Sequence, residues 1–197
     1  MTKMSKKKAA ILRAATALFA TKGFADTHMS ELSSITGAAE GTIFYHFKNK
    51  EHILLTILSD TKVSIVEEFN AHMDEREFET GMEMMEEVVA FYLLFAGRME
   101  YQFLILHSLF IYRLAESRVE FRDNLEAIYN CLVTLFEQAI FKGQEDGSIG
   151  DVNPRKSALI VFTMVDGLVR FKNFNLYDAG ALFNELIDSV RRMLKPN

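Results

Sequence analysis

The chain has 197 residues, of which 49% are hydrophobic and 12% aromatic, with only two prolines and ten glycines. This composition excludes a disordered or fibrous protein, and a folded chain of this length buries roughly 70% of its unfolded surface. Charge is unevenly divided, since residues 1–50 carry a formal charge of +5 and the remainder carries −10. A small basic segment on a larger acidic body favours contact with a polyanion through the basic segment.

The sequence shows no pattern typical of a secreted or membrane protein. Arg13 interrupts the apolar stretch that follows the N-terminal lysines, and no cleavage site follows it, so we expect no signal peptide. The longest uncharged apolar stretches, 88–97 and 101–112, are shorter than the roughly 20 residues that span a bilayer. The single Cys131 cannot form an intramolecular disulfide. We therefore expect a cytoplasmic protein.

Three helices are predicted in the N-terminal segment. Apolar residues at helical spacing predict the first over residues 5–22, with Gly23 as a left-handed C-cap. Thr27 is expected to cap the second helix, which the turn at 36–38 ends. The third is expected over residues 40–47. The side chains expected to face inward are Met29, Leu32 and Ile35 from the second helix, and Ile43, Phe44 and Phe47 from the third.

The arrangement of these helices has two possible interpretations. Two short helices joined by a three-residue turn that contains glycine, and braced by a preceding helix, are typical of a helix-turn-helix. An ordinary helical corner has the same spacing. The charge of +5 and the polar residues of the third helix favour a DNA-binding motif.

Further helices are predicted through the rest of the chain, and no segment alternates as a β-strand does. They are expected over residues 51–72, 78–97, 99–115 and 117–142, with an acidic connector at 73–79. The clearest loop, 142–152, precedes Asn153 and Pro154, a strong helix start. That helix is expected to reach about residue 174, and a last helix covers 178–194. The predicted fold class is all-α.

Residues 11–54, "ILRAATALFATKGFADTHMSELSSITGAAEGTIFYHFKNKEHIL", resemble without a gap the DNA-binding domain of the TetR (tetracycline-repressor) family of bacterial transcriptional regulators. Residues 147–169 are more weakly similar to the start of that family's dimerisation helix. The resemblance implies a homodimer that binds a palindromic operator on double-stranded DNA and usually represses. It also implies a helix-turn-helix domain over residues 1–50, joined to a helical ligand-binding and dimerisation domain over residues 51–197.

The resemblance assigns roles to the third helix, which would enter the major groove. Gly41 would let the backbone approach the bases, with Thr42 and Tyr45 at the DNA face. Thr27 would cap the second helix and contact a phosphate, and His46 and Lys50 would hold the DNA backbone. The expected DNA-binding residues are Thr27, Glu40, Gly41, Thr42, Tyr45, His46, Lys48 and Lys50.

Two positions depart from the family's pattern. Phe44 stands where the family often has tyrosine, so one hydroxyl that could bind a phosphate is missing. Glu40 stands where lysine is frequent. A carboxylate near phosphates lowers affinity, but it can accept a hydrogen bond from cytosine or favour the positive end of a helix. We expect Glu40 to tune sequence preference or to stabilise the helix N-terminus rather than to abolish DNA binding. Ala39 also lacks the side chain of a good N-cap.

An enzyme is not expected, and neither is a metal or a cofactor. The sequence contains no HExxH, glycine-rich phosphate loop or CxxC, and none of its five histidines follows a glutamate at the spacing of a di-iron site. The alternative to a regulator is a helical scaffold or interaction protein without an effector. That alternative explains the body but not the basic segment.

The body is rich in Phe and Met, most of which we expect to pack its core. The resemblance implies a cavity in the body, and soft or aromatic walls suit a small hydrophobic effector of acyl-like or aromatic character. Core burial is the competing interpretation for His107. The candidate lining residues are Phe91, Phe95, Phe103, His107, Phe110 and Phe162.

The helix expected over 154–174 is apolar on more than one side, which in a chain of this size predicts a partner. Gly167 would allow close approach of two backbones on a two-fold axis. The expected interface consists of Ala158, Val161, Val165, Gly167, Leu168, Leu186 and Val190.

The helix expected over 51–72 is the covalent link from the DNA-binding segment to the body. Two helix-turn-helix units in a dimer must enter major grooves about 34–36 Å apart or a multiple of that. An effector that tilts this helix would change the separation, and we expect it to release the protein from DNA.

Overall fold

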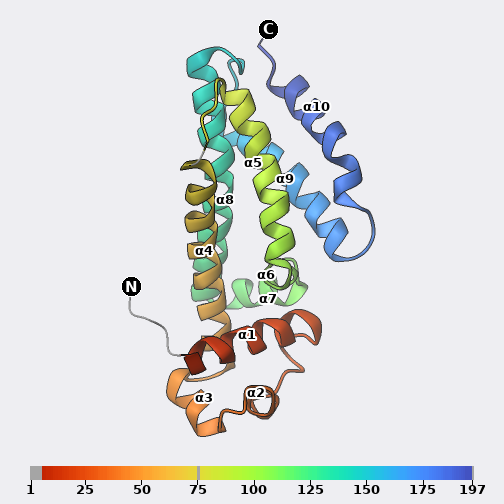
Figure 1. Cartoon of the computed structure of the whole chain (residues 1–197). Helices are drawn as coiled ribbons and strands as arrows, with labels where there is room; N and C mark the ends of the chain where they lie inside the picture. The colour runs from red at the N-terminus through yellow and green to blue at the C-terminus, as the bar shows by residue number, and fades with distance from the viewer. Residues whose placement is uncertain (1–5, 75, 197) are drawn as a thin grey trace. The chain divides into compact units, whose positions relative to one another are not determined.

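The computed structural model describes residues 6–74 and 76–196, and every regular element in these ranges is a helix (Figure 1). The all-α prediction is confirmed. The predicted start of the first helix at Ser5 lies outside the described residues. The helices are α1 (Lys6–Thr21), α2 (Met29–Thr36), α3 (Glu40–His46), α4 (Lys50–Asp74), α5 (Gly81–Arg98), α6 (Glu100–Leu106), α7 (Leu109–Ser117), α8 (Val119–Asp146), α9 (Pro154–Asn173), the 3-10 helix η1 (Ala179–Leu182) and α10 (Phe183–Leu194).

Contacts within the chain gather into two compact units. Of the described residues, the first unit holds 6–61 and 101–126, and the second holds 62–100 and 127–196. The division falls inside α4, α6 and α8, so each of these helices contributes residues to both units, with Glu100 the only residue of α6 in the second unit. The domain boundary expected between residues 50 and 51 does not coincide with this division, and it stays a prediction.

In the first unit α1 packs against both α2 and α3 around an apolar core. Gly23 (φ 94°) and Gly37 (φ 64°) both adopt the left-handed backbone that ends α1 and α2, as the sequence predicts. The ring of Phe24 stacks on that of Phe110 in α7, with centroids 4.4 Å apart. The core side chains are Ile11, Leu12, Ala15, Phe19, Leu32, Ile43, Phe47, Ile53 and Leu54.

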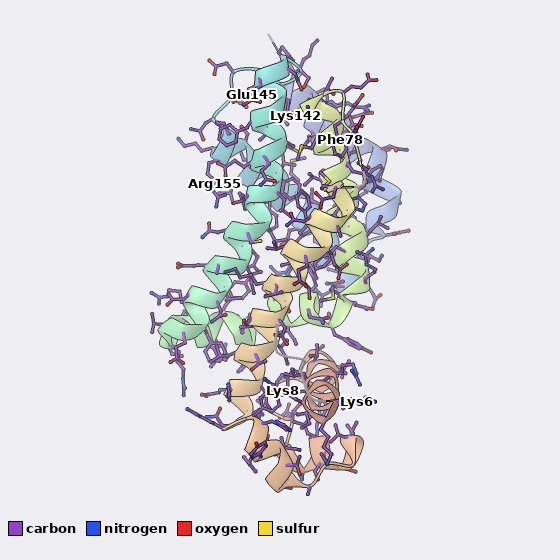
Figure 2. The ribbon with its side chains drawn as sticks, turned by 60° about the vertical axis from the view of Figure 1, so that its left-hand side comes forward. Lys6, Lys8, Phe78, Lys142, Glu145 and Arg155 are labelled. Carbon is purple, nitrogen blue, oxygen red and sulfur yellow. The ribbon has the colours of Figure 1, made fainter. Side chains whose placement is uncertain are left out.

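In the second unit α5 packs against α9 and α10, while Arg155 joins the start of α9 to α8 (Figure 2). Its guanidinium donates to Asn130 Oδ1 at 2.6 Å and to Glu137 Oε2 at 3.2 Å. The core side chains are Met85, Val88, Val89, Tyr92, Phe136, Ala139, Ala158, Val161, Val165 and Val190.

The helix ends show where capping can be predicted and where it cannot. Asn153 caps α9 as expected, because its Oδ1 accepts from the backbone N–H of Lys156 at 2.9 Å, with Pro154 as the first helical residue. The prediction of one helix over 99–115 is wrong. Ser108 has an extended backbone and its hydroxyl donates to the Ile105 carbonyl at 2.7 Å, so the chain turns between α6 and α7.

The predicted bounds of the following helix are also wrong, because α8 begins at Val119 and continues to Asp146. It ends where Gly147 takes a positive φ of 78°. Within the described ranges no helix is by itself both long and apolar enough to cross a bilayer. Only α5 and α6 taken together meet that test, with a bend of 96° between them.

Candidate nucleic-acid interface

Helix α3 has one face in the core of the first unit and the other in solvent. Ile43 and Phe47 lie four residues apart on the buried side. Gly41, Thr42 and Tyr45 lie on the opposite side, and the Tyr45 side chain is 84% exposed. This face of α3 is therefore accessible to a partner.

The turn between α2 and α3 is held by Thr36. Its hydroxyl donates to the Leu32 carbonyl at 2.6 Å and accepts from the backbone N–H of Ala38 at 3.3 Å. Gly37, in the left-handed conformation, completes the turn. These contacts fix the path from the second helix to the third, as a helix-turn-helix requires.

Two side chains that we expected to face inward lie in solvent instead. Ile35 is 60% exposed and Phe44 is 49% exposed. The reason is the shortness of the helices, since α2 has eight residues and buries only Leu32, while α3 has seven and buries Ile43. With so few buried positions on each helix, a second row of apolar residues remains outside.

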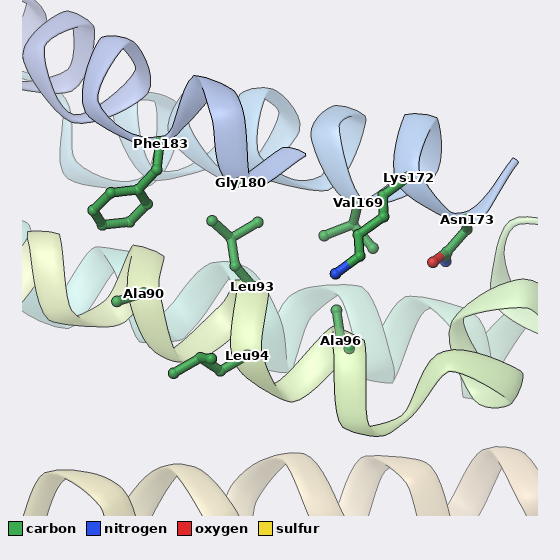
Figure 3. A pocket seen from close by; sticks show the side chains of 10 residues that line it. Ala90, Leu93, Leu94, Ala96, Val169, Lys172, Asn173, Gly180 and Phe183 are labelled. Atoms are coloured by element: carbon green, nitrogen blue, oxygen red, sulfur yellow. The ribbon is translucent and has the colours of Figure 1, made fainter. Parts of the chain in front are cut away.

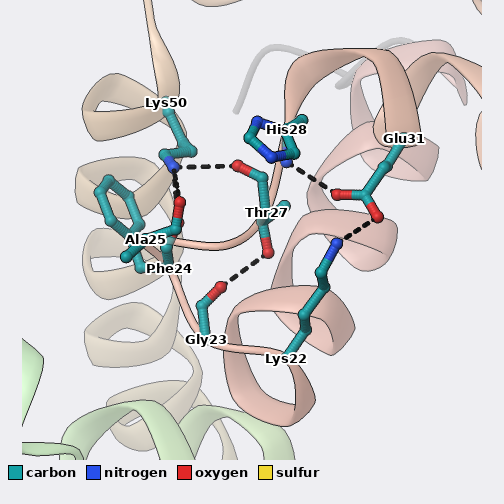
Figure 4. A network of polar contacts seen from close by, with 8 residues as sticks. All are labelled: Lys22, Gly23, Phe24, Ala25, Thr27, His28, Glu31 and Lys50. Carbon is teal, nitrogen blue, oxygen red and sulfur yellow. Dashed lines mark hydrogen bonds and ion pairs between the residues drawn. The ribbon is translucent and has the colours of Figure 1, made fainter.

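The predicted capping role of Thr27 is wrong, because the N-cap of α2 is His28. The backbone N–H of His28 donates to Glu31 Oε2 at 2.8 Å. Thr27 is 0% exposed, and its hydroxyl donates to the Gly23 carbonyl at 2.8 Å (Figure 4). Its side chain therefore fixes the loop between α1 and α2 and presents no surface to a phosphate.

Lys50 also lies against this loop (Figure 4). Its ammonium donates to the carbonyls of Phe24, Ala25 and Thr27 at 2.5, 3.1 and 2.9 Å, and lies 4.5 Å from the centroid of the Phe24 ring. An ammonium has three N–H groups, so all are used. Burial lowers the pKa of Lys50, because these contacts withdraw the charge from water. The group expected to hold a phosphate is thus committed to the loop.

A salt bridge joins the end of α1 to the first turn of α2. Lys22 Nζ lies 2.5 Å from Glu31 Oε1. The hydrogen bond from Lys22, followed by the one from the His28 backbone, holds the pKa of Glu31 below its ordinary value. Both bonds favour the ionised carboxylate, which also lies at the positive end of the α2 dipole.

The remaining predicted contacts lie on or near the exposed side. Glu40 and Lys48 are exposed, and His46 is half-buried with its ring 5.1 Å from that of Tyr45. Ala39 makes no side-chain cap at the start of α3, as expected. Asn49 was missed as a cap, although an asparagine before a helix is a recognisable signal. Its Oδ1 accepts from the backbone N–H of His52 at 2.8 Å and so begins α4.

The six candidate effector residues divide between the two units. Phe103, His107 and Phe110 belong to the first unit, and His107 is buried, with its ring 5.9 Å from that of Phe103. In the second unit the rings of Phe91 and Phe95 stack at 5.5 Å. The last of the six, Phe162, packs against Tyr92, Tyr129 and Phe136.

The second unit contains a cavity of about 470 Å³ between α5, α9 and the start of α10, and none of the six candidates lines it (Figure 3). Sequence reasoning missed this cavity because its walls come from segments far apart in the chain. Its lining residues are Ala90, Leu93, Leu94, Ala96, Gly97, Val169, Lys172, Asn173, Gly180 and Phe183.

Most of the predicted dimer interface is wrong, because five of its seven residues pack the core of their own chain. These five are Ala158, Val161, Val165, Leu186 and Val190. Gly167 and Leu168 are half-buried. The other side of α9 is the one left open, since Leu159 and Ile160 are each 52% exposed. A Cβ at Gly167 would meet no atom of the chain within 4 Å.

In the described residues no three or more His, Cys, Asp or Glu side chains come together as metal ligands do.

Residues 11–57 match the family model described as bacterial regulatory proteins, tetR family. Over 182 residues the chain is 26% identical to the fatty acid metabolism regulator protein of Bacillus subtilis (strain 168), covering 90% of each chain.

Solved structures share the fold over nearly the whole chain. The Bacillus subtilis regulator FadR in complex with stearoyl-CoA is 22% identical, with a TM-score of 0.75 over 92% of this chain and 96% of that one. A putative transcriptional regulator from Saccharomonospora viridis in complex with choline is 20% identical, with a TM-score of 0.86 over 98% of this chain and 100% of that one.

Proposed function

This chain belongs to the TetR family of bacterial transcriptional regulators, and we propose that it is a repressor that a small hydrophobic effector releases from a palindromic operator. The observation that carries the proposal is the outward face of α3. Gly41 leaves room for the backbone to approach base edges, while Thr42 can hydrogen-bond to them. Tyr45 projects from the same face, and its hydroxyl can donate to a phosphate. The exposed Lys48 adds a positive charge that forms no ion pair within the described residues.

Two chains are needed to read a palindrome, and α9 offers a surface for pairing. Its outward side carries Leu159, Ile160, Thr163, Gly167 and Phe171, at the three- and four-residue spacing of one helix face. Glycine in a helix costs about 1 kcal/mol relative to alanine, and close approach of a second α9 at Gly167 would offset that cost. In this proposal the dimer forms through a face of α9 that shares only Gly167 with the predicted interface.

The switch in this proposal depends on α4. It is one uninterrupted helix of 25 residues that contributes to both units. An effector that binds one conformation of the second unit more tightly would shift the population toward it and move the N-terminal end of α4. Such a coupling is typically 1–3 kcal/mol and acts equally in both directions. We propose that this takes place in the cytoplasm, where the operator is accessible.

The two solved structures hold bound molecules of different chemistry. One structure holds stearoyl-CoA, an anionic thioester with a long chain, and the other holds choline, a small cation. An effector for this chain must therefore be argued from its own residues.

The proposal is tested by selecting bound duplexes from a random DNA pool. We expect enrichment of a palindrome whose half-sites are one helical turn or a multiple apart. Thr42→Val should change the preferred base at one symmetric position of the palindrome. Lys48→Met should instead lower the affinity for all duplexes alike and reduce the salt dependence of binding. If no sequence is enriched from the pool, the proposal of a sequence-specific regulator is contradicted, and the alternative of a helical scaffold is favoured.

A further inference from the structure

The cavity of the second unit is polar at one end and apolar at the other. Figure 3 shows Lys172 and Asn173 toward one end and Phe183 and Ala90 toward the other, with Leu93 between them. Apart from the lysine and the asparagine, the lining side chains are aliphatic or aromatic. A volume of about 470 Å³ is within the range of small-molecule sites.

Lys172 brings a positive charge to the lining of the cavity. No residue in the lining carries a carboxylate, and the described part of the chain contains no ion pair to this ammonium. Gly97 stands opposite, where even a Cβ would lie 4.0 Å from Lys172 Nζ. The absence of a side chain at Gly97 leaves space beside the ammonium, so a ligand atom can reach it.

Asn173 supplies a donor that has lost water without gaining an acceptor. Its Nδ2 is buried and has no hydrogen-bond partner among the described residues. Leaving a buried donor unsatisfied costs about 1–3 kcal/mol. An acceptor brought by a ligand would recover this free energy, and Lys172 in the adjacent position favours an acceptor that is negatively charged.

We propose that this cavity binds a single-chain fatty acid, with its carboxylate on Lys172 and Asn173 and its chain running past Leu93 toward Phe183. The inference rests on the proposed function, since it names the effector class of the regulator. A choline-like head would be repelled by the ammonium, and the lining has one aromatic ring rather than the cage that quaternary ammonium groups require.

The test compares three probes that share a twelve-carbon chain: laurate, dodecan-1-ol and dodecyltrimethylammonium, with the two ionic probes below their micelle concentrations and the alcohol below its solubility limit. Isothermal titration calorimetry on the full chain without DNA should rank laurate first, dodecan-1-ol second and the cationic probe last. Equal or tighter binding of dodecyltrimethylammonium would overturn the assignment of the head. Lauroyl-CoA has a neutral thioester in place of the carboxylate, so binding of lauroyl-CoA tighter than that of laurate would overturn the free carboxylate as the recognised group.

Variants distinguish recognition of the carboxylate from recognition of the hydrocarbon chain of the ligand. Lys172→Met should weaken laurate about tenfold, the loss of one charge-assisted hydrogen bond, and leave dodecan-1-ol unchanged. Lys172→Arg should restore most of the affinity. Ala90→Phe should weaken both probes, because the larger ring fills the apolar end. Lys62→Met, an exposed lysine of the same unit outside the cavity, is the matched control and should change neither. Unchanged laurate affinity in Lys172→Met would overturn the proposal.

The same variants keep this inference apart from the proposed function. Binding of the selected duplex is measured first without a fatty acid. If the protein binds the duplex but not laurate, the assignment of a fatty acid to the cavity is wrong, and the proposed function as a regulator is unaffected. If neither wild type nor variants bind DNA, the proposed function fails whatever laurate does. If both the duplex and laurate bind, laurate should lower the affinity of the protein for the duplex. The Lys172→Met variant should need about ten times more laurate for the same effect.

Discussion

The loop between α1 and α2 and the cavity of the second unit use a lysine in opposite ways. Lys50 gives all three of its N–H groups to carbonyls of its own chain, whereas Lys172 faces an apolar cavity with no carboxylate in the lining. The first fixes a local structure, because its bonding capacity is already used. The second can recognise a ligand, because its capacity is not. Residue type alone would have given both the same role.

Helices α3 and α9 extend the comparison to whole faces. Both bury apolar residues on one side and expose others on the opposite side. The exposed side of α3 combines a glycine, a threonine and a tyrosine, which suits a polar partner, while that of α9 carries Leu159 and Ile160. The first is expected to meet DNA and the second another copy of the chain.

The largest expected effect concerns the exposed face of α9. Ile160→Glu places two unpaired charges at a two-fold interface, so we expect the dissociation constant of the dimer to rise at least a hundredfold, about 3 kcal/mol. Sedimentation velocity at micromolar concentration should show a monomer. Gln138→Glu, on an exposed position of α8, should leave the dimer intact. A wild-type protein that is already monomeric would contradict the pairing of α9.

The next prediction compares the effects on stability of substituting Lys50, the first residue of α4, and Lys48, which lies just before that helix. Lys50→Met leaves three carbonyls without their charged donor, and we expect the free energy of unfolding to fall by about 2 kcal/mol. Lys48→Met should change it by less than about 0.5 kcal/mol. Urea denaturation followed by circular dichroism measures both. If the two variants were equally stable, the assignment of a structural role to Lys50 would be wrong. The phosphate contact predicted for Lys50 from the sequence would then be the better explanation.

A smaller effect is expected at the exposed face of α3. Tyr45→Ala should weaken binding of the selected duplex about tenfold, through the loss of a phosphate hydrogen bond and its ring contact, with no change in stability. Tyr45→Phe should account for the part that is due to the hydroxyl. Fluorescence anisotropy gives the affinities. Retention of wild-type affinity in Tyr45→Ala would place the DNA on another face.

The smallest effect is the dependence of stability on pH at the salt bridge between Lys22 and Glu31. The folded state lowers the pKa of Glu31 from its ordinary value of 4.5, so the unfolded state binds a proton more readily. The contribution to the free energy of unfolding is therefore present above pH 4.5 and is lost as pH falls through the folded pKa. Glu31→Gln should flatten the loss of thermal stability in this range, whereas Glu126→Gln should not. If thermal stability depended on pH in the same way in wild type and in Glu31→Gln, the salt bridge would not contribute to the pH dependence.

The sequence was sufficient for features that depend on neighbouring residues. Asn153 followed by Pro154, and the glycines at 23 and 37, act through local backbone geometry, so their roles could be predicted. Outward faces could not, because the same apolar pattern fits a helix covered on one side or on two. Phe44 and Val161 were assigned to opposite sides from those they occupy for this reason.

Contacts across long sequence separations were also beyond prediction. The carbonyls that bind Lys50 lie 23 to 26 residues before it, in a loop whose path depends on the packing of α1 against α2. The cavity depends on three helices, and its polar end, Lys172 and Asn173, looks in the sequence like the ordinary last turn of a helix. Neither pattern is visible before the chain is folded.

The most direct test of the central claim is a titration of the selected duplex at several salt concentrations, followed by fluorescence anisotropy. We expect saturation at a multiple of two chains per duplex, and a linear fall of the logarithm of affinity with the logarithm of salt concentration, with a slope of about −0.9 for each phosphate contact. Affinity that does not change with salt, or saturation at one chain per duplex, would contradict a dimer that holds DNA through the outward faces of its two α3 helices.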